Sequence, residues 1–436
     1  MNHQEPMLEV GIVSGIEINF HFPCPYFISG QTGKEKTYSG TFAVSFKEGK
    51  ILFENQTFTV LEFEPVNKAD SAFELFDVRI GINFHWERTE KQVFEGHLKC
   101  IVEDDKITAV NRIPLESYLN SVISSEMSAK ASAELLKAHA VISRSWLLSQ
   151  MQQKGKNVTK NPGFIENDSE RIRWYDREDH ANFDVCADDH CQRYQGITRA
   201  STPQVREAVK ATRGQVLYSE NEICDARFSK CCGGILEEFQ YCWEDSPKPY
   251  LVGLADHTEQ TTVPDLRMEE NAKSWILGNP PAFCNTSDKS VLQQVLNNYD
   301  QETADFFRWT VSYKKEEISK LIHERSGIDF GEIQELIPME RGVSGRIVKL
   351  NIIGNKKSLI IGKELEIRRT LSTSHLYSSA FVVEKTDEGF ILHGAGWGHG
   401  VGLCQIGAAM MGEKGYKYTD ILHHYYPNTE LKHLYD

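Results

Sequence analysis

The sequence lacks two features that would each assign it to a familiar class of protein. No run approaches the roughly 18 consecutive apolar residues of a membrane-spanning helix, so no transmembrane segment is expected. There is also no basic excess, because Lys and Arg total 48 against 62 Asp and Glu, giving a formal net charge of −14. A duplex nucleic-acid binder needs a concentrated basic face. We therefore expect no nucleic-acid partner.

The chain also lacks a recognisable export signal and a regular cysteine framework. The first residues, MNHQEPMLEV, have neither the basic nor the apolar region of a secretory signal, so either the protein stays inside the cell or the chain has been trimmed. The 10 cysteines stand at uneven spacings. This pattern is unlike that of a small disulfide-rich domain. We expect metal ligands and buried thiols rather than disulfide bridges.

The 436 residues, 40% of them hydrophobic, are enough for a large packed core. Short alternating runs between Leu8 and about Val110 predict strands. IPLESYLNSVISSEM predicts a helix with Pro114 in its first turn, and ASAELLKAHAVISRSWLLSQ predicts a second helix. Residues 157–202 form a long polar excursion that needs something to hold it. FRWTVSYKKEEISKLIHERSG predicts a strand and a helix, and SGRIVKLNIIGNKKSLII predicts a hairpin.

No internal repeat or low-complexity linker divides the chain. The sequence therefore predicts an α+β fold with a β-rich N-terminal part, built as one elaborated unit over residues 8–436. Its expected parts, in chain order, are a β-rich part, two helices with the polar loop, a variable insertion and a C-terminal β/α part with a Gly-rich strand-loop-helix: 8–110, 111–252, 253–305 and 306–436.

The least ordinary stretch is HGAGWGHGVGLCQIGAA, His393 to Ala409. The spacing G-x-G-x-x-G fails in every register and no Walker lysine follows, so a phosphate cradle has little support. A metal site is weakened by the lack of a carboxylate at the spacing of a zinc protease. Two interpretations remain open. The glycines could expose backbone for a bulky sugar polymer, with Trp397 stacking on a sugar face, or they could allow a tight turn and close packing, with His399 as a buried structural histidine.

The segment DREDHANFDVCADDHCQRYQG offers two imidazoles and two thiols, a set that suits tetrahedral Zn²⁺. The candidate ligands are His180, Cys186, His190 and Cys191. Their spacing is not that of a zinc finger, and adjacent His190 and Cys191 require a sharp turn. A metal would nevertheless explain how this long polar segment is ordered. The alternative is a pair of free cysteines on a loop.

The C-terminal sequence GAGWGHGVGLCQIGAAMMGEKGYKYTDILHHYYPNTEL resembles the signature of the SpoIID/LytB family. Further blocks agree in order along the chain: IPLESYLNSVISSEM, LLKAHAVISRSWLL, DVCADDHCQRYQG, ARFSKCCGG, SGRIVKLNI and LEIRRTL followed by LYSSAF. The resemblance covers nearly everything from Leu8 onwards. Cys404 stands where the family usually has serine, and Cys231 and Cys232 fall where it is Ser-rich, so any hydroxyl role at these positions is in doubt.

The resemblance implies a lytic transglycosylase that cuts the MurNAc–GlcNAc bonds of peptidoglycan in strands lacking stem peptides, leaving 1,6-anhydro-MurNAc ends. Hydrolysis of a glycoside normally uses two carboxylates, whereas this reaction needs one, because the sugar's own 6-hydroxyl attacks C1. Glu126 is the matching position, expected to act as general acid and then as base. It ends an apolar helix, where partial burial would favour the protonated acid. An ordinary charged helix terminus is the plain alternative.

The resemblance also covers Arg144, which we expect to hold substrate or to organise the cleft, because direct contact with Glu126 would oppose the acid role. An exposed helix arginine is the alternative. The expected sugar contacts lie in the glycine-rich stretch: Trp397, Gly398, His399, Gly400 and Gln405. Family members carry a block like that around Cys186 with bound zinc, which implies Zn²⁺ here too. Four protein ligands would make it structural, whereas an open position would suggest catalysis.

Two other functions remain as alternatives. Some relatives enhance a cell-wall amidase, so the protein could bind glycan strands without cutting them. A zinc amidase using the His180 cluster is weaker, since four ligands leave no open site. The implied peptidoglycan substrate favours the cell envelope or periplasm, while the missing signal leaves the cytoplasm as the alternative location.

Overall fold

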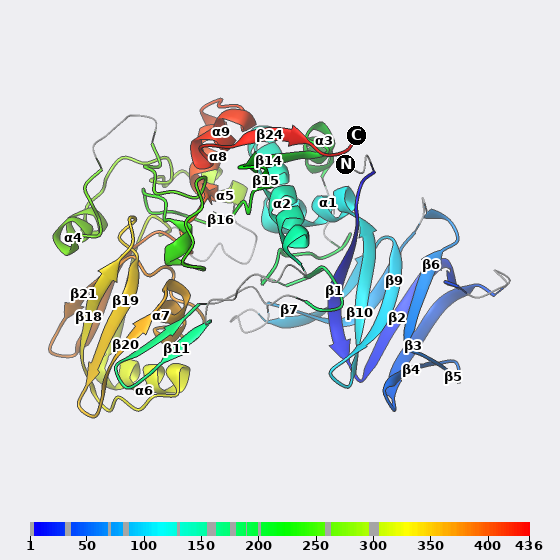
Figure 1. Ribbon diagram of the computed structural model, residues 1–436, viewed down its shortest axis with the longest axis horizontal. Coiled ribbons are helices and arrows are strands. Elements are labelled where there is room, and N and C mark those ends of the chain that lie inside the picture. Colours follow the sequence, from blue (N-terminus) through cyan, green and yellow to red (C-terminus); the bar gives the residue numbers. More distant parts are fainter. Residues whose placement is uncertain are drawn as a thin grey trace.

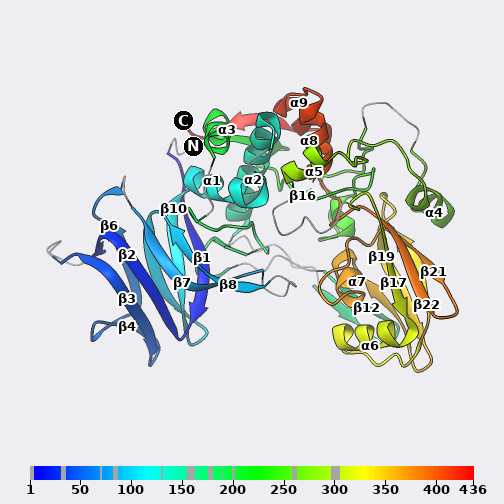
Figure 2. The same cartoon turned by 180° about the vertical axis from the view of Figure 1, so that it is seen from behind.

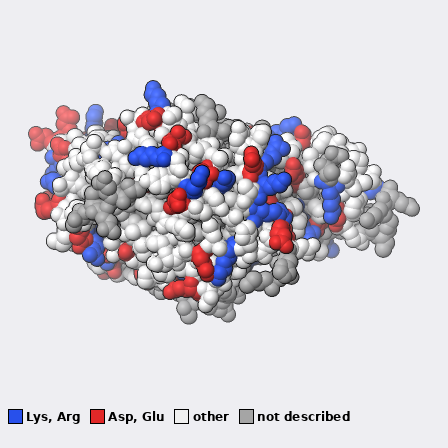
Figure 3. All heavy atoms as spheres, turned by 90° about the horizontal axis from the view of Figure 1, so that it is seen from above, with Lys and Arg blue, Asp and Glu red and all other residues white. Residues whose placement is uncertain are grey.

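The computed structural model describes residues 4–30, 36–68, 71–81, 87–128, 131–154, 163–174, 180–188, 190–198, 202–257, 263–295 and 305–436. In this part of the chain, two lobes rich in β-structure flank a helical centre (Figures 1 and 2). The predicted α+β class and the β-rich N-terminal part are confirmed. Charged side chains of both signs are interspersed on the face seen in Figure 3.

The N-terminal lobe is one large sheet whose strands alternate between buried and more exposed residues. In β2, Phe20, Phe22 and Tyr26 are buried, and the rings of Phe22 and Tyr26 stack with centroids 4.2 Å apart. Short turns set the register: Asp104 and Asp105 both have positive φ and join Glu103 to its partner Lys106. The strands are β1 (Met7–Gly15), β2 (Glu17–Ile28), β3 (Tyr38–Lys47), β4 (Lys50–Phe53), β5 (Gln56–Phe58), β6 (Val60–Pro65), β7 (Phe73–Ile80), β8 (Arg88–Phe94), β9 (His97–Glu103) and β10 (Lys106–Pro114).

Both helices predicted after this sheet are present, as α1 (Leu115–Glu126) and α2 (Ala133–Gln153). Pro114 differs from the prediction, because it ends β10 opposite Met7 and caps α1 instead of lying in its first turn. The Ser132 hydroxyl accepts a hydrogen bond from the Leu135 amide and so begins α2. Every residue of α2 from Ala138 to Gln150 is buried, so this helix runs through the core.

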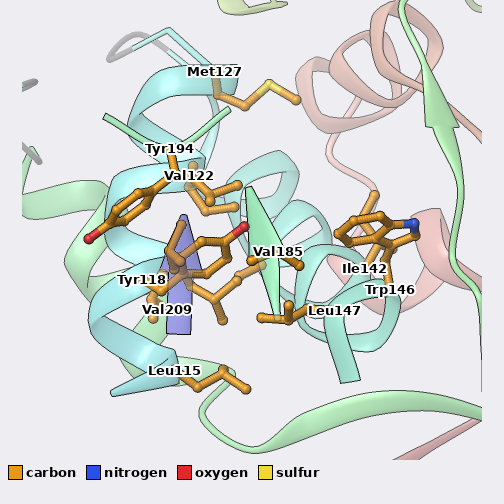
Figure 4. Packing of buried hydrophobic residues seen from close by; sticks show 14 of the residues in the cluster. Leu115, Tyr118, Val122, Met127, Ile142, Trp146, Leu147, Val185, Tyr194 and Val209 are labelled. Atoms are coloured by element: carbon orange, nitrogen blue, oxygen red, sulfur yellow. The ribbon is translucent and has the colours of Figure 1, made fainter. Parts of the chain in front are cut away.

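The remaining central elements pack around α1 and α2. Figure 4 shows Tyr118 and Val122 of α1 and Ile142 and Leu147 of α2 in this core, with Val185 near them. The elements are α3 (Pro203–Ala211), α5 (Lys289–Val295), α8 (Gln405–Glu413), α9 (Tyr418–Tyr425) and the strands β14 (Gln215–Ser219), β15 (Glu222–Ile223) and β24 (Glu430–His433). In the strand order β15-β14-β24, the C-terminal strand pairs with a strand from the middle of the chain.

The C-terminal lobe has two sheets and its own buried core. The expected strand and helix are β17 (Arg308–Lys314) and α6 (Lys315–Ser326), and the expected hairpin is β19 (Ile347–Gly354) with β20 (Ser358–Gly362). The other elements are β11 (Phe164–Glu166), β12 (Glu170–Arg173), β18 (Ile333–Arg341), β21 (Phe381–Lys385), β22 (Gly389–Ala395) and α7 (Glu364–Thr370). Outside these sheets lie α4 (Glu269–Leu277) and the pair β16 (Phe228–Ser229) and β23 (Leu403–Cys404).

The polar excursion 157–202 connects the two lobes. Its strand β12 runs parallel to β20 in the C-terminal lobe. Its short strand β13 (Val185–Cys186) runs parallel to β1 at the edge of the N-terminal sheet. Residues 155–162, 175–179, 189 and 199–201 of this region lie outside the described residues. The excursion is thus held by strand pairing at both ends, which its polar composition does not reveal.

Candidate functional site

Glu126 is the last residue of α1, and the chain then turns into an extended conformation at Met127. One carboxylate oxygen of Glu126 accepts a hydrogen bond of 3.1 Å from the backbone amide of Arg193. The side chain is partly buried. Glu126 is therefore held by the polar excursion, through a donor that belongs to the main chain.

The segment that supplies this amide packs tightly along α1. The Gln195 amide donates to the Ser121 hydroxyl at 3.2 Å, and the Tyr194 ring stacks on Tyr118 with centroids 4.9 Å apart. The Tyr118 hydroxyl in turn donates to the side-chain oxygen of Gln192 at 3.4 Å. Because Tyr118 and Tyr194 are both buried (Figure 4), the position of the segment against α1 is well defined.

All four candidate zinc ligands come together immediately before this segment. The Cys191 sulfur lies 3.5 Å from a nitrogen of His180 and 3.5 Å from a nitrogen of His190, and Cys186 lies 3.9 Å from His190. One ligand atom from each residue falls within 4.8 Å of the others. Tetrahedral zinc with Zn–S of about 2.3 Å and Zn–N of about 2.0 Å places sulfur and nitrogen about 3.5 Å apart, so these residues fit the ion.

The electrostatics of the cluster agree with a cation site. Hydrogen bonding with Cys191, His180 and His190 holds the pKa of the Cys186 thiol far below its usual range, although burial opposes the shift. The thiolate is the form of cysteine that binds metal. With four protein ligands, a bound zinc would have a closed shell, which is the arrangement of structural sites.

A cavity of about 620 Å³ lies beside the cluster, a size typical of ligand sites. Its wall includes His180, His190, Arg193 and Gln195 from the excursion, and it reaches β1, β7 and β10 of the N-terminal sheet. Arg193 is thus both a wall residue of the cavity and the amide donor to Glu126. The glycine-rich stretch does not contribute to this wall.

Arg144 lies in a different environment from Glu126. It is fully buried, and its guanidinium forms two hydrogen bonds with Glu116, at 2.9 Å and 2.7 Å, and a third with the carbonyl of Gln215. The Tyr435 hydroxyl also donates to Glu116. Arg144 is therefore not the exposed helix arginine of the plain alternative. Of the two expected roles, holding substrate and organising the cleft, its full burial disfavours direct contact with substrate, and its ion pair with Glu116 joins α2 to α1.

The glycine-rich stretch wraps around a buried arginine that the sequence did not single out. Arg346 donates to the carbonyl of Gly398 at 3.2 Å and 3.1 Å and to the carbonyl of Cys232 at 3.1 Å. A Cβ placed on Gly400 would lie 2.4 Å from the Arg346 guanidinium, and the φ of Gly400 is +78°. Close packing and left-handed backbone therefore account for glycine at this position.

The predicted sugar-contact side chains are not equally accessible. Gln405 is buried, and its side-chain nitrogen lies 3.3 Å from His139 on α2. Trp397 is partly exposed and forms an aromatic group with Tyr377 and Phe306, whose ring centroids lie 4.3 Å and 4.8 Å from its own. The Trp397 ring is therefore accessible for stacking on a sugar, whereas the Gln405 side chain is buried in contact with His139.

His399 is partly buried, and its Nδ1 accepts a hydrogen bond from the Val401 amide at 3.0 Å. Its ring packs edge-on against Trp243, with centroids 4.7 Å apart. Burial and the nearby charges of Arg227 and Arg346 hold the pKa of His399 well below its usual value. The ring is therefore neutral at physiological pH, with its proton on Nε2.

Sequence reasoning missed three polar residues of this region: Glu116, His139 and Arg346. Glu116 and His139 lie in the quoted helical blocks, and Arg346 lies in SGRIVKLNI, but none belongs to a catalytic spacing. Their burial is the informative feature, because buried charged and polar groups require partners. Only the contacts across the fold reveal which partners these are.

The fold and site define a class of α+β protein in which a Cys/His loop lies beside a cavity and a residue of the cavity wall donates its amide to a helix-terminal glutamate. A glycine-rich turn packs on a buried arginine in the same fold. The model of the family described as Stage II sporulation protein matches residues 103–218, and a model described as a domain of unknown function matches residues 237–402. A Stage II sporulation protein D of Bacillus amyloliquefaciens is 25% identical over 324 residues, covering 74% of this chain and 75% of the relative.

Two further relatives extend the comparison. An uncharacterized protein of Brachyspira hyodysenteriae is 24% identical over 338 residues, covering 78% of this chain and 72% of its own length. The Amidase enhancer of Bacillus subtilis is 26% identical over 330 residues, covering 72% of this chain but only 40% of the enhancer. These matches support the resemblance to the SpoIID/LytB family that the sequence motifs indicated.

None of the helices in the described ranges combines the length and apolar character that crossing a bilayer would require.

Proposed function

We propose that this protein is a peptidoglycan lytic transglycosylase with Glu126 as its acid and base. Two relatives carry the name Stage II sporulation protein D and one is named Amidase enhancer, which supports a role in the cell wall. The observation that carries the proposal is the setting of Glu126. It ends a buried helix and is oriented by an amide of the same segment that lines the cavity.

In the proposed reaction, the carboxylic acid of Glu126 donates its proton to the oxygen that links MurNAc to GlcNAc, and the C1–O bond breaks. The resulting carboxylate then accepts the proton of the MurNAc 6-hydroxyl as that oxygen bonds to C1. The products are a GlcNAc with a free 4-hydroxyl and a 1,6-anhydro-MurNAc end. Glu126 returns to the acid form, so neither water nor a second carboxylate is consumed.

We assign the His180 cluster a structural Zn²⁺ that would be held by His180, Cys186, His190 and Cys191. The ion would fix the turn that presents the Arg193 amide, two residues after Cys191, to Glu126. Orienting a reacting group through its surroundings is a common use of such sites. The ion would have no open position for substrate or water.

A second candidate is a non-catalytic enhancer that binds glycan strands for a cell-wall amidase. It is favoured by the name of one relative and by the partly exposed rings of Trp397 and Tyr377, which lie next to each other. Arg144 and Gln405, expected at the site from the family resemblance, are both occupied by contacts inside the fold. The two candidates differ in whether glycan is cut.

The test is mass spectrometry of peptide-free glycan strands after incubation with the wild type, Glu126→Gln and the control Glu316→Gln. Glu316 is an exposed residue in the first turn of α6. We expect 1,6-anhydro ends from the wild type and the control, and a loss of at least about 100-fold for Glu126→Gln, the usual scale of a general acid-base group. Strands that are bound but left intact by all three proteins would replace this proposal with the enhancer.

The proposed substrate sets the proposed place of action, which is the cell envelope. Fractionation of producing cells tests it directly. The protein would be expected in the fraction that contains peptidoglycan, and exclusive recovery with cytoplasmic enzymes would contradict an envelope role.

A further inference from the structure

A second group of metal-ligand side chains lies in the core, apart from the His180 cluster. Its members are Cys232, Asp256, Cys284 and Cys404, and one ligand atom from each lies within 4.8 Å of the others. All four side chains are at least nine-tenths buried. They come from four separate segments, so the fold itself, and not a short sequence motif, brings them together.

The separations fit a single tetrahedral ion. The sulfurs of Cys232 and Cys284 are 3.6 Å apart, and two thiolates bound to one Zn²⁺ at about 2.3 Å lie about 3.8 Å apart. Three thiolates make a soft ligand set, which favours zinc over magnesium or calcium. Cys231, the neighbour of Cys232, is also buried and its thiol interacts with Cys284 and Cys404, but it does not belong to the set of mutually close ligand atoms that includes Asp256.

The surroundings of the four residues orient them as ligands. The Cys232 amide donates to the Cys404 sulfur at 3.2 Å, and the Gly234 amide donates to the Cys232 sulfur at 3.4 Å. Amide donors to sulfur favour the thiolate over the neutral thiol. The two oxygens of Asp256 are held by the Tyr425 hydroxyl at 2.7 Å and by the Cys284 amide at 2.8 Å. Such hydrogen bonds around the ligands are typical of metal sites.

Positive charge is also available nearby to offset the excess negative charge of three thiolates and a carboxylate. Arg346 donates to the Cys232 carbonyl, and Arg308 donates to the Gly233 carbonyl at 3.2 Å. The charge of Arg308 interacts with Cys232 and Cys284.

We propose that Cys232, Cys284, Cys404 and Asp256 form a second, closed structural Zn²⁺ site. On binding, the ion displaces the protons of the three thiols, which pass to solvent. Cys404 lies within the glycine-rich stretch as the N-cap residue of α8, and Cys231, beside Cys232, pairs with Trp397. The ion would therefore fix the position of the glycine-rich stretch, independently of whether the protein cuts glycan.

The test is the zinc content of purified, reduced protein by elemental mass spectrometry, measured in a His190→Ala, Cys191→Ser background that disables the other cluster. We expect about one zinc per chain in this background, and none after a further Cys284→Ser or Cys404→Ser change. Cys404→Ser restores the serine that is usual in the resembled family, so this variant should still fold, as circular dichroism would verify. Cys231→Ser and the remote, buried Cys100→Ser are the controls and should keep the metal.

Two results would overturn the proposal. The background protein has nine cysteines, the ten of the chain less Cys191. If it is metal-free and all nine thiols react with a thiol reagent after denaturation, the four residues are simply buried and bind no ion. A metal-free protein that, when purified without reductant, has seven reactive thiols and a Cys232–Cys284 peptide pair linked by a disulfide would show a redox bridge instead. Co²⁺ substitution in the same background provides a second readout, because the thiolate-to-cobalt charge-transfer band should be lost in Cys404→Ser and kept in Cys231→Ser.

Discussion

Glu126 and Arg144, paired in one expected site, have different surroundings in the structure. Glu126 lies at a helix end beside the cavity wall, whereas Arg144 is enclosed with Glu116 in the centre of the protein. The resemblance identified both positions but gave no information on their partners. A buried ion pair of this kind is destabilising to break, because the remaining charge is left without a partner.

The change Arg144→Met should lower the free energy of unfolding by about 3–5 kcal/mol, since it strands the Glu116 carboxylate. Adding Glu116→Leu should recover a large part of this loss. Denaturant unfolding measures both variants, and the turnover of the folded fraction should change little. Unchanged stability together with a raised KM would instead show that Arg144 contacts substrate.

His139 gives the protein a sensitivity to acid. Burial, reinforced by Lys230, lowers the pKa of His139 from 6.5 to about 3 in the folded state. Below pH 6.5 the unfolded chain therefore binds a proton that the folded chain does not, so the contribution to stability that is present above pH 6.5 is lost as pH falls toward 3. The slope is up to about 1.4 kcal/mol per pH unit for one such group.

Urea unfolding between pH 7 and pH 4 tests this expectation. The Gln variant of His139 should show a shallower loss of stability than the wild type over this range. His433→Gln, which alters an exposed histidine, should follow the wild-type curve. Parallel curves for the wild type and the His139 variant would contradict the assignment.

At the scale of elements, sequence periodicity was informative wherever a segment buries one face. The alternation in β2, the helical spacing of α1 and α2 and the hairpin of β19 and β20 could all be predicted, because each follows from local burial. The parallel pairing of β12 with β20 and of β13 with β1 could not. These strands are very short, and their partners lie far away in the chain.

In the glycine-rich stretch, the cost of a steric clash can be measured separately from the cost of a left-handed backbone. Gly400→Ala should cost more than about 2 kcal/mol of stability, because it adds a clash with Arg346 to the strain of a left-handed residue. Gly415→Ala is the matched control, since Gly415 has a φ of +85° but nothing near its missing Cβ.

The control should therefore cost only about 1 kcal/mol, the backbone part of the effect. Thermal or denaturant unfolding of the two variants separates the cost of the clash with Arg346 from the cost of the left-handed backbone. Equal losses would mean that Arg346 moves aside and that the glycines serve some other purpose, such as access for a ligand.

At the scale of the whole molecule, the excursion with the His180 cluster links both lobes to the helix that carries Glu126. Cys191→Ser should therefore reduce zinc content, increase hydrogen exchange at residues 190–198 and lower the yield of 1,6-anhydro ends by about 10-fold or more, the usual effect of losing a supporting contact. Cys24→Ser, in the N-terminal sheet, is the control. Full activity in a Cys191→Ser protein that has lost the zinc of the His180 cluster would separate this cluster from the reaction.

The candidate site could be predicted only where its residues are neighbours in sequence. His180, Cys186, His190 and Cys191 lie within one block and come together as expected. The second group joins Cys404 to Cys232, Asp256 and Cys284, all of which lie more than a hundred residues before it. Arg346 meets Gly398 through tertiary packing alone. Such convergence is a property of the folded chain, and no spacing in the sequence encodes it.

The hydrogen bond from the Arg193 amide to Glu126 has a consequence for variation at position 193. Because the donor is the main chain, nearly every amino acid at this position would preserve the contact, and proline alone lacks the hydrogen. Arg193→Pro should therefore reduce glycan cleavage more than Arg193→Ala, because both variants lose the side chain that lines the cavity and only proline also loses the amide hydrogen. The difference between the two variants measures the main-chain contact alone.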